Sequence, residues 1–149
     1  MFSHQPFHYH TLADLQADIA HTGVDLPTTT DSRVLAEPLQ AGCLSLPNRL
    51  VVLPMEGCDG LADGSPDELT IRRYKRFAAG GAGLLWVEAT SVVPEARANP
   101  RQLWIHEGTL RAFAAMVDST IRAARERFGE GHTPALVLQL THSGRYSKP

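Results

Sequence analysis

The sequence predicts an α/β fold in which parallel strands alternate with helices. Three apolar runs, at residues 50–55, 83–93 and 135–140, have the composition of strands that are buried on both faces. Two amphipathic segments, at about 65–79 and 109–128, separate these runs and are long enough to connect parallel strands. A doubly wound sheet and a TIM barrel both fit this order, and both place their chemistry at the carboxyl ends of the strands.

Residues 1–33 form a polar extension before this α/β region. Within the extension, apolar residues spaced three and four apart predict a short helix over residues 12–22, which Gly23 would end. The next two extended stretches, at residues 34–39 and 43–46, flank a turn and predict a small hairpin.

The ends and buried side of both helices can be read from the sequence. Ser65 is expected to cap the first helix, with Pro66 in its first turn and Glu68 at the capping-box position. Gly80-Gly81 is expected to end it. The second helix is expected to bury the apolar residues Leu110, Phe113, Ala114, Val117, Ile121 and Ala124.

Composition excludes several classes of partner. The net charge of −2 does not favour a nucleic acid or an acidic lipid surface, and the longest apolar stretch, residues 77–87, is too short to span a membrane. Cys43 and Cys58 are only two thiols, and the chain begins without the pattern of a secretory signal. A reducing, cytoplasmic setting is therefore expected. The histidines near the start lack a convincing set of ligand partners, so no metal site is expected.

Polar and reactive residues follow each of the three predicted strands. These are Pro54-Met-Glu-Gly-Cys58, Glu88-Ala-Thr90 and Gln139-Leu-Thr-His-Ser-Gly-Arg145. Because the carboxyl ends of parallel strands meet at one edge of a sheet, these segments together predict an active-site rim. No glycine-rich phosphate turn opens a helix after the first strand, which argues against a dinucleotide-binding fold.

In these segments the chain resembles the old yellow enzyme family, the FMN-dependent NADH:flavin oxidoreductases. The matching pieces, in family order, are Pro47–Met55, Asp63–Glu68, Gly80–Leu84, Glu88–Thr90 and Gln139–Arg145. The resemblance covers roughly residues 34–149. It implies that this part is an FMN-binding, incomplete TIM (β/α)8 barrel, made of the first three βα units with the hairpin closing its bottom.

The resemblance also implies which residues contact the flavin. The backbone of Pro54, Met55 and Glu56 would contact the isoalloxazine, and the small Ala89 would let the ring approach closely. Gln139 would form hydrogen bonds with the pyrimidine edge, to which an amide is suited because that edge carries both donors and acceptors.

Glu56 departs from the family pattern, in which Thr or Cys is common at this position. An ionised glutamate cannot donate a hydrogen bond to a flavin carbonyl, and it would disfavour a reduced anionic flavin. Three alternatives follow: the Glu56 side chain points away from the flavin, its carboxyl group is protonated, or the redox properties of the flavin are tuned differently from those of the family.

Three further residues are candidates either for substrate contact or for support of a loop. Cys58 lies two residues beyond Glu56 and could modulate the flavin, but a plain loop thiol is the default interpretation. His142 is balanced between the two roles, and Arg145 is expected to bridge the loop or lie at the surface.

Other polar residues near the strand ends are expected to be structural. Glu88 is expected to be a core carboxylate paired to a neighbouring strand rather than an acid–base catalyst. Asp63 and Asp67 are expected to serve the turn and the start of the helix. Arg97 and Arg101 are expected to be solvated loop charges, with contact to an acidic substrate group or a partner subunit as the alternative.

The function implied by the family is transfer of hydride from NADH or NADPH, through FMN, to a small enone-type substrate. A TIM barrel needs about 250 residues, and the catalytic residues and phosphate loops of the family are expected downstream of Pro149. The chain is therefore expected to be the amino-terminal part of a larger enzyme and to be inactive alone. The alternatives are a non-catalytic fragment that self-associates through open sheet edges and another flavin- or phosphate-binding TIM barrel.

Overall fold

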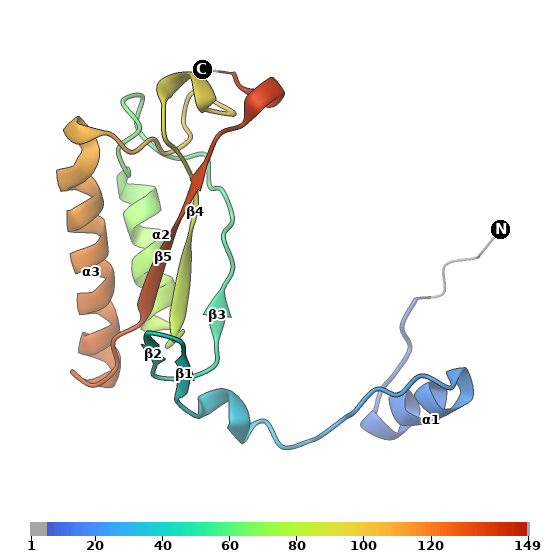
Figure 1. The fold of residues 1–149 in the computed structure, drawn as a ribbon. Coiled ribbons are helices and arrows are strands. Elements are labelled where there is room, and N and C mark those ends of the chain that lie inside the picture. The colour runs from blue at the N-terminus through green and yellow to red at the C-terminus, as the bar shows by residue number, and fades with distance from the viewer. Residues whose placement is uncertain (1–5, 149) are drawn as a thin grey trace. The chain divides into compact units, whose positions relative to one another are not determined.

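The computed structural model describes residues 6–148, and the chain divides into two compact units, Met1–Val34 and Leu35–Pro149. In the first unit, α1 spans Leu12–Thr22, as the apolar spacing predicts (Figure 1). The Thr11 side chain caps the helix within a capping box, and the last turn is followed by Gly23 with φ 68°.

The second unit begins with the expected hairpin, although its first strand starts later than predicted and includes residues expected in the turn. β1 (Leu39–Ala41) pairs in antiparallel fashion with β2 (Leu44–Leu46). Residues 34–36, expected to be extended, instead belong to a 3-10 turn over Arg33–Ala36. Pro38 explains the late start of the ladder, because proline has no N–H to donate to a paired strand.

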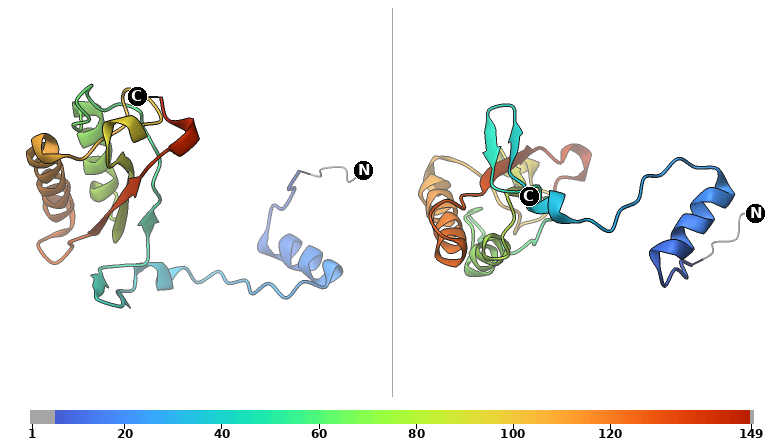
Figure 2. Two further views of the ribbon diagram at one scale, coloured as in Figure 1. Left: turned by 45° about the horizontal axis from the view of Figure 1, so that its top comes forward. Right: turned by 90° about the horizontal axis from the view of Figure 1, so that it is seen from below.

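The three predicted βα strands form one parallel sheet. β3 (Val51–Val52), β4 (Leu84–Ser91) and β5 (Ala135–Thr141) lie in the order β3-β4-β5. The connecting helices α2 (Glu68–Ala79) and α3 (Leu110–Phe128) pack on the same face of this sheet (Figures 1 and 2). The predicted strand–helix alternation and parallel pairing are confirmed, but the described residues form an open sheet and not a closed barrel.

Apolar residues between the sheet and the two helices form the core. One cluster is centred on Tyr74, Val87, Leu103, Phe113 and Met116, and a second one on Ala78, Ala82, Leu85 and Ala124. Leu136 of β5 packs against both clusters. The helices therefore cover the face of β4 and β5 that carries Leu85, Val87 and Leu136.

The expectation that the first strand is buried on both faces is wrong for this chain. Only Val51 and Val52 pair as a strand, and the side chains of Val51, Leu53 and Met55 are 46%, 71% and 79% exposed. Val52 packs against the helices, so alternation along the strand turns its neighbours to the opposite face. Within the described residues of the second unit, 35–148, no element covers that face.

The buried side of α3 is also different from the predicted stripe. The buried residues are Phe113, Met116, Thr120, Ala123 and Ala124, whereas Leu110 is 52% exposed and Ala114 is exposed. Apolar side chains alone did not define the face, because Thr120 is buried with its hydroxyl donating to the Met116 carbonyl at 2.7 Å. A threonine satisfied within its own helix can replace an apolar residue in the core.

The cap of α2 is Asp67, which corrects the expectation of Ser65. The Asp67 carboxylate accepts from the Glu68 N–H at 2.6 Å, while the Ser65 hydroxyl donates to Asp63 at 3.1 Å. The helix starts two residues later than the capping-box pattern suggested, because Asp63 holds Ser65 in the preceding turn. The predicted end of the helix at Gly80 is confirmed.

Replacing Asp67 with alanine is expected to lower the free energy of unfolding by about 1 kcal/mol, because the first turn of α2 loses its side-chain acceptor. Asp67→Asn keeps a capping oxygen and is expected to lose less. Chemical denaturation followed by tryptophan fluorescence measures both variants. An equal loss in the two would show that the charge of Asp67, and not its cap, stabilises the helix.

Candidate functional site

The three strand ends lie at one edge of the sheet, as the sequence predicts. Parallel pairing brings the carboxyl ends of β3, β4 and β5 to the same edge (Figure 1). Residues 54–58 follow β3, residues 88–90 lie in the last part of β4, and residues 139–145 span the end of β5 and the turn after it. The register between β4 and β5 shifts between Val87 and Thr90, so Gln139 lies opposite this irregular stretch of β4. Ala89 and Gln139 are therefore neighbours across adjacent strands.

Gln139 lies at the end of the sheet face that the helices leave open. Leu136 and Leu138 pack against the helices, so alternation along β5 turns Gln139 to the opposite face. Trp86 on β4 is 40% exposed between the buried Leu85 and Val87, which places it on the same open face. The polar end of an apolar face is a suitable surface for a flat ring with a polar edge.

The Gln139 carboxamide is exposed and makes no hydrogen bond to any residue that the structure describes. It thus keeps both donor and acceptor capacity for a ligand. The neighbouring Ala89 is half-buried and its carbonyl accepts from the buried Gln102 side chain at 3.1 Å. The loop after β4 therefore fixes the backbone at Ala89, a contact that the sequence did not reveal.

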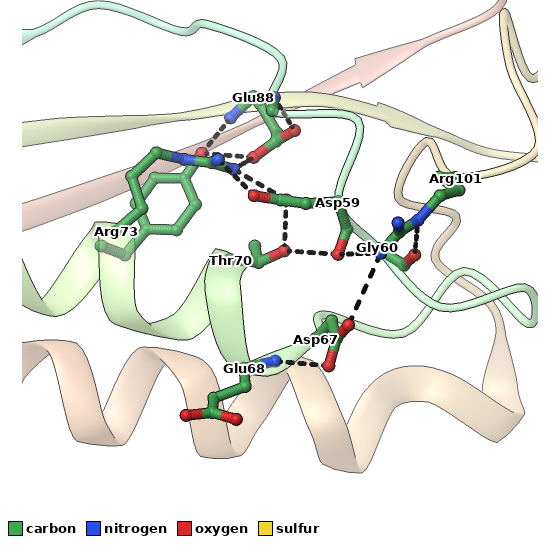
Figure 3. A network of polar contacts seen from close by, with 10 residues as sticks. Asp59, Gly60, Asp67, Glu68, Thr70, Arg73, Glu88 and Arg101 are labelled. Atoms are coloured by element: carbon green, nitrogen blue, oxygen red, sulfur yellow. Dashed lines mark hydrogen bonds and ion pairs between the residues drawn. The ribbon is translucent and has the colours of Figure 1, made fainter.

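Glu88 is the centre of a buried polar network beneath the strand ends (Figure 3). Its side chain is 1% exposed and accepts from the Gly57 N–H at 2.9 Å, the Tyr74 hydroxyl at 3.2 Å and the Arg73 guanidinium. The Glu88 N–H in turn donates to the Tyr74 oxygen at 2.8 Å. Burial is the main cause that raises the pKa of Tyr74, and the charge of the Glu88 carboxylate raises it further, so the hydroxyl stays protonated and can donate.

Arg73 of α2 joins Glu88 to a second carboxylate, Asp59, in the loop after β3. It donates to Asp59 at 2.6 and 3.2 Å, and the Thr70 hydroxyl donates to the same carboxylate at 2.7 Å (Figure 3). Glu88 is thus a core carboxylate, as expected, but it pairs with helix α2 and the loop after β3 rather than with a neighbouring strand. One guanidinium links both strand ends to the helix.

Gly57 is in close contact with this network. A Cβ placed on Gly57 would lie 1.9 Å from Nη1 of Arg73, so only glycine lets the guanidinium pack against this backbone. Arg73 and Tyr74 could not be recognised from the sequence as partners of the strand ends. Their only signal was a charged residue beside a tyrosine in the middle of an amphipathic helix.

Arg97 is not the solvated loop charge that was expected. It is 6% exposed, and it donates to the carbonyls of Ala62, at 2.9 Å, and Pro100. Its own carbonyl accepts from the Lys148 N–H at 2.7 Å. Arg97 therefore connects the loops after β3, β4 and β5 and is not available to a substrate. Arg101 remains exposed and donates to the Gly60 carbonyl at 3.1 Å.

The three weaker candidates make only local contacts in the described chain. The Cys58 thiol is exposed and accepts a hydrogen bond from the Asn99 amide at 3.1 Å. The backbone of Cys58 itself has φ 50°. His142 accepts from the Gly144 N–H at 3.0 Å, and Arg145 donates to the Tyr146 hydroxyl at 2.7 Å. All three therefore have local partners in the loops, and the choice between substrate contact and loop support stays a prediction.

The ionised form of Glu56 is disfavoured in the folded chain, and a substitution can reveal this cost. Burial, together with the nearby Glu88 carboxylate, raises the pKa of Glu56. A raised carboxyl pKa costs stability once the group ionises: the cost is absent below the unfolded-state pKa and is complete above the folded one. Glu56→Gln is therefore expected to stabilise the protein slightly, by less than about 1 kcal/mol at pH 7.

Thermal unfolding of Glu56→Gln and the parent chain from pH 3.5 to pH 7 tests this expectation. The difference in Tm should appear as the pH rises through the pKa of Glu56. Glu37→Gln, at an exposed residue of the same unit, is the matched control. A Glu56→Gln variant that is less stable than the parent at pH 7 would contradict the assignment.

Two further features of residues 6–148 bear on other kinds of site. None of the helices there has the length and apolar character needed to cross a bilayer. The same residues contain no group of three or more His, Cys, Asp or Glu side chains placed to hold a metal ion.

Comparison with known proteins identifies the relatives of this arrangement. No protein-family model matches the chain. An NADPH dehydrogenase from Geobacillus thermodenitrificans is 34% identical over 119 residues, which are 77% of this chain and 32% of that protein. The chain thus spans about a third of the length of this curated relative.

Solved structures of other proteins are similar to this chain in both sequence and fold. Morphinone reductase is 32% identical, with a TM-score of 0.58 over 80% of this chain and 29% of that one. The structure of TcOYE with pHBA is 25% identical, with a TM-score of 0.63 over 77% of this chain and 29% of that one. The old yellow enzyme from Trypanosoma cruzi, at 24% identity and a TM-score of 0.61 over 77% of this chain and 28% of that one, shares the fold.

Proposed function

We propose that this chain belongs to the old yellow enzyme family and that its strand ends form one side of the FMN site of an NAD(P)H-dependent oxidoreductase. The observation that carries the proposal is the Gln139 amide, which makes no hydrogen bond within residues 6–148 and lies beside Ala89 on the open face of the sheet. The segment after β3 reaches the same edge. A flat, polar-edged ring fits a surface that is apolar along the strands and polar at their ends.

In this proposal the residues of the chain bind and orient the cofactor. The backbone of Pro54, Met55 and Glu56 lies along one side of the ring, Ala89 leaves room for it, and Gln139 pairs with its polar edge. Bound FMN supplies the capacity to accept hydride from a nicotinamide and to pass it to an alkene. NADPH is the favoured reductant, since the curated relative is named an NADPH dehydrogenase, and the proposed substrate is a small enone-type molecule.

We further propose that the 149-residue chain does not turn over alone. It matches 28–32% of the length of the relatives named above, so most of each of those proteins has no counterpart in it. The expected behaviour is weak FMN binding without NADPH oxidation.

Quenching of FMN fluorescence during titration tests the flavin site. Gln139→Leu keeps the size of the side chain and removes its polar atoms, so FMN binding should weaken about tenfold. Gln40→Leu changes an exposed glutamine in the hairpin and should leave FMN binding unaltered. Equal FMN affinity in Gln139→Leu and the parent chain would refute the role of Gln139, and NADPH turnover by the parent chain would refute its inactivity.

A second proposal concerns self-association of this chain. The open face of the sheet exposes the large apolar side chains Val51, Leu53, Met55 and Trp86, and β5 ends with Leu140, which is 60% exposed. Contiguous apolar surface of this kind favours association with another copy.

Light scattering coupled to size-exclusion chromatography measures the oligomeric state. Leu53→Glu puts a charge on the open face and is expected to shift the chain to the monomer. Leu110→Glu is the matched control, because Leu110 is 52% exposed on α3 and should not alter assembly. A parent chain that elutes as a monomer at every concentration tested would refute this proposal.

A further inference from the structure

Glu88 is buried at a position where a carboxylate is costly unless all of its contacts are donors. Its side chain is 1% exposed, and the three groups that contact it, the Gly57 N–H, the Tyr74 hydroxyl and the Arg73 guanidinium, all donate. Only one of these, Gly57, belongs to a loop. Arg73 and Tyr74 of α2 hold the Glu88 carboxylate in place, and the carboxylate in turn holds one backbone N–H of the segment that follows β3.

The segment around Gly57 has little else to fix it. β3 ends at Val52, and residues 53–58 carry no regular secondary structure. Cys58 has φ 50°, an uncommon backbone conformation for a residue other than glycine. Such a conformation persists only where neighbouring contacts determine it. Both sequence neighbours of Cys58 are held: the Gly57 N–H donates to Glu88, and the Asp59 carboxylate pairs with Arg73.

We propose that Glu88 is a positioning residue that fixes the segment Pro54–Cys58 at the strand edge by holding the Gly57 N–H, with Arg73 clamped between Glu88 and Asp59. The inference rests on the proposed flavin site, because this is the segment whose backbone would lie along the ring. It assigns Glu88 no proton transfer and no contact with the ring. Its effect on the cofactor passes through the backbone of residues 54–56.

The close approach at Gly57 supports this assignment. Because a Cβ there would meet Arg73 Nη1 at 1.9 Å, the guanidinium lies directly against the backbone that it helps to hold. The clamp thus acts on Gly57 in two ways: Glu88 accepts its N–H, and the Arg73 guanidinium limits the space on its Cα side. Loss of either contact would free the same short segment.

Residue-resolved amide hydrogen exchange by NMR on the full 149-residue chain tests the proposal without any flavin. In Glu88→Gln the Gly57 amide is expected to exchange about tenfold faster or more, since it loses a charge-assisted acceptor. The Gly60 amide, which donates to the Arg101 carbonyl at 2.9 Å, and the amides of β4 should change by less than about twofold. Glu107→Gln, at an exposed residue, is the matched control.

Equal acceleration of Gly57 and β4 amides would make Glu88 an ordinary stabiliser of the core and would overturn the proposal, as would an unchanged Gly57 amide. If Glu88→Gln does not fold, Arg73→Lys gives the same comparison, because it keeps the charge and removes the planar fork. Selective acceleration at Gly57 is again the expected result, and uniform acceleration again overturns it. Failure of the flavin site would appear in the FMN titration of Gln139→Leu and would leave this exchange result unaffected.

Discussion

Replacing Arg73 with methionine is expected to lower the free energy of unfolding by about 3 kcal/mol, the lower end of the range for breaking a buried ion pair. Methionine fills a similar volume, so the loss comes from the two carboxylates left without a cation. Glu88 is 1% exposed and Asp59 is 14% exposed. The lower end of that range is appropriate because the Arg73 side chain is 23% exposed, so water partly screens its charge.

Urea unfolding followed by tryptophan fluorescence measures this change, since Trp86 and Trp104 both lie in the second unit. Arg72→Met is the matched control: Arg72 is the preceding residue of α2, it is exposed, and it forms no ion pair within the described chain. Its substitution is expected to change stability by less than about 0.5 kcal/mol. Similar losses in the two variants would show that α2 responds to the removal of charge in general.

The effect of Arg73→Met should also depend on pH. Burial alone would raise the pKa of Asp59, but hydrogen bonds from Arg73 and Thr70 outweigh it and lower the pKa. A lowered carboxyl pKa contributes stability above its unfolded value, and that stability is lost as pH falls through the folded value. The stability difference between the parent chain and Arg73→Met is therefore expected to narrow below about pH 4.

The order of the elements could be predicted from the sequence because each one carries a local pattern. Apolar runs gave the three strands, the spacing of apolar residues gave α1, and Gly80 marked the end of α2. The boundaries that failed depended on contacts between elements. Asp63 bonds to Ser65 and delays the start of α2, a competition that a capping-box pattern cannot reveal.

The strand-end position of the candidate site could be predicted, since parallel topology alone brings those ends together. The partners of Glu88 could not, because Arg73 lies 15 residues away on a helix and its direction depends on how α2 packs on β4. Burial of Arg97 was missed for the same reason: the carbonyls that surround it belong to the loops after β3 and β4. Sequence patterns placed the segments, and tertiary packing decided which polar groups meet.

Replacing Gly64 with alanine is expected to cost about 2–4 kcal/mol, the sum of a strained left-handed backbone and an overpacked contact. Gly64 has φ +88°, and an added Cβ would lie 2.5 Å from Trp104 Cβ and 2.8 Å from the Trp104 carbonyl oxygen. Backbone atoms cannot rotate away as a side-chain tip can. The segment around Trp104 is also anchored, since the N–H of the next residue, Ile105, donates to the Ser91 carbonyl at 3.0 Å.

The same substitution should loosen the strand-end loops as well as destabilise the fold. The Gly64 carbonyl accepts from the Trp104 N–H at 3.0 Å, which ties the loop after β3 to the loop after β4. Urea unfolding gives the stability, and near-ultraviolet circular dichroism reports the packing of Trp104. Gly131→Ala is the matched control, because an added Cβ there meets no atom within 4 Å. A Gly64→Ala variant that unfolds at the same urea concentration as Gly131→Ala would show that the two loops can separate at no cost, and it would remove the support that this contact gives to the strand-end site.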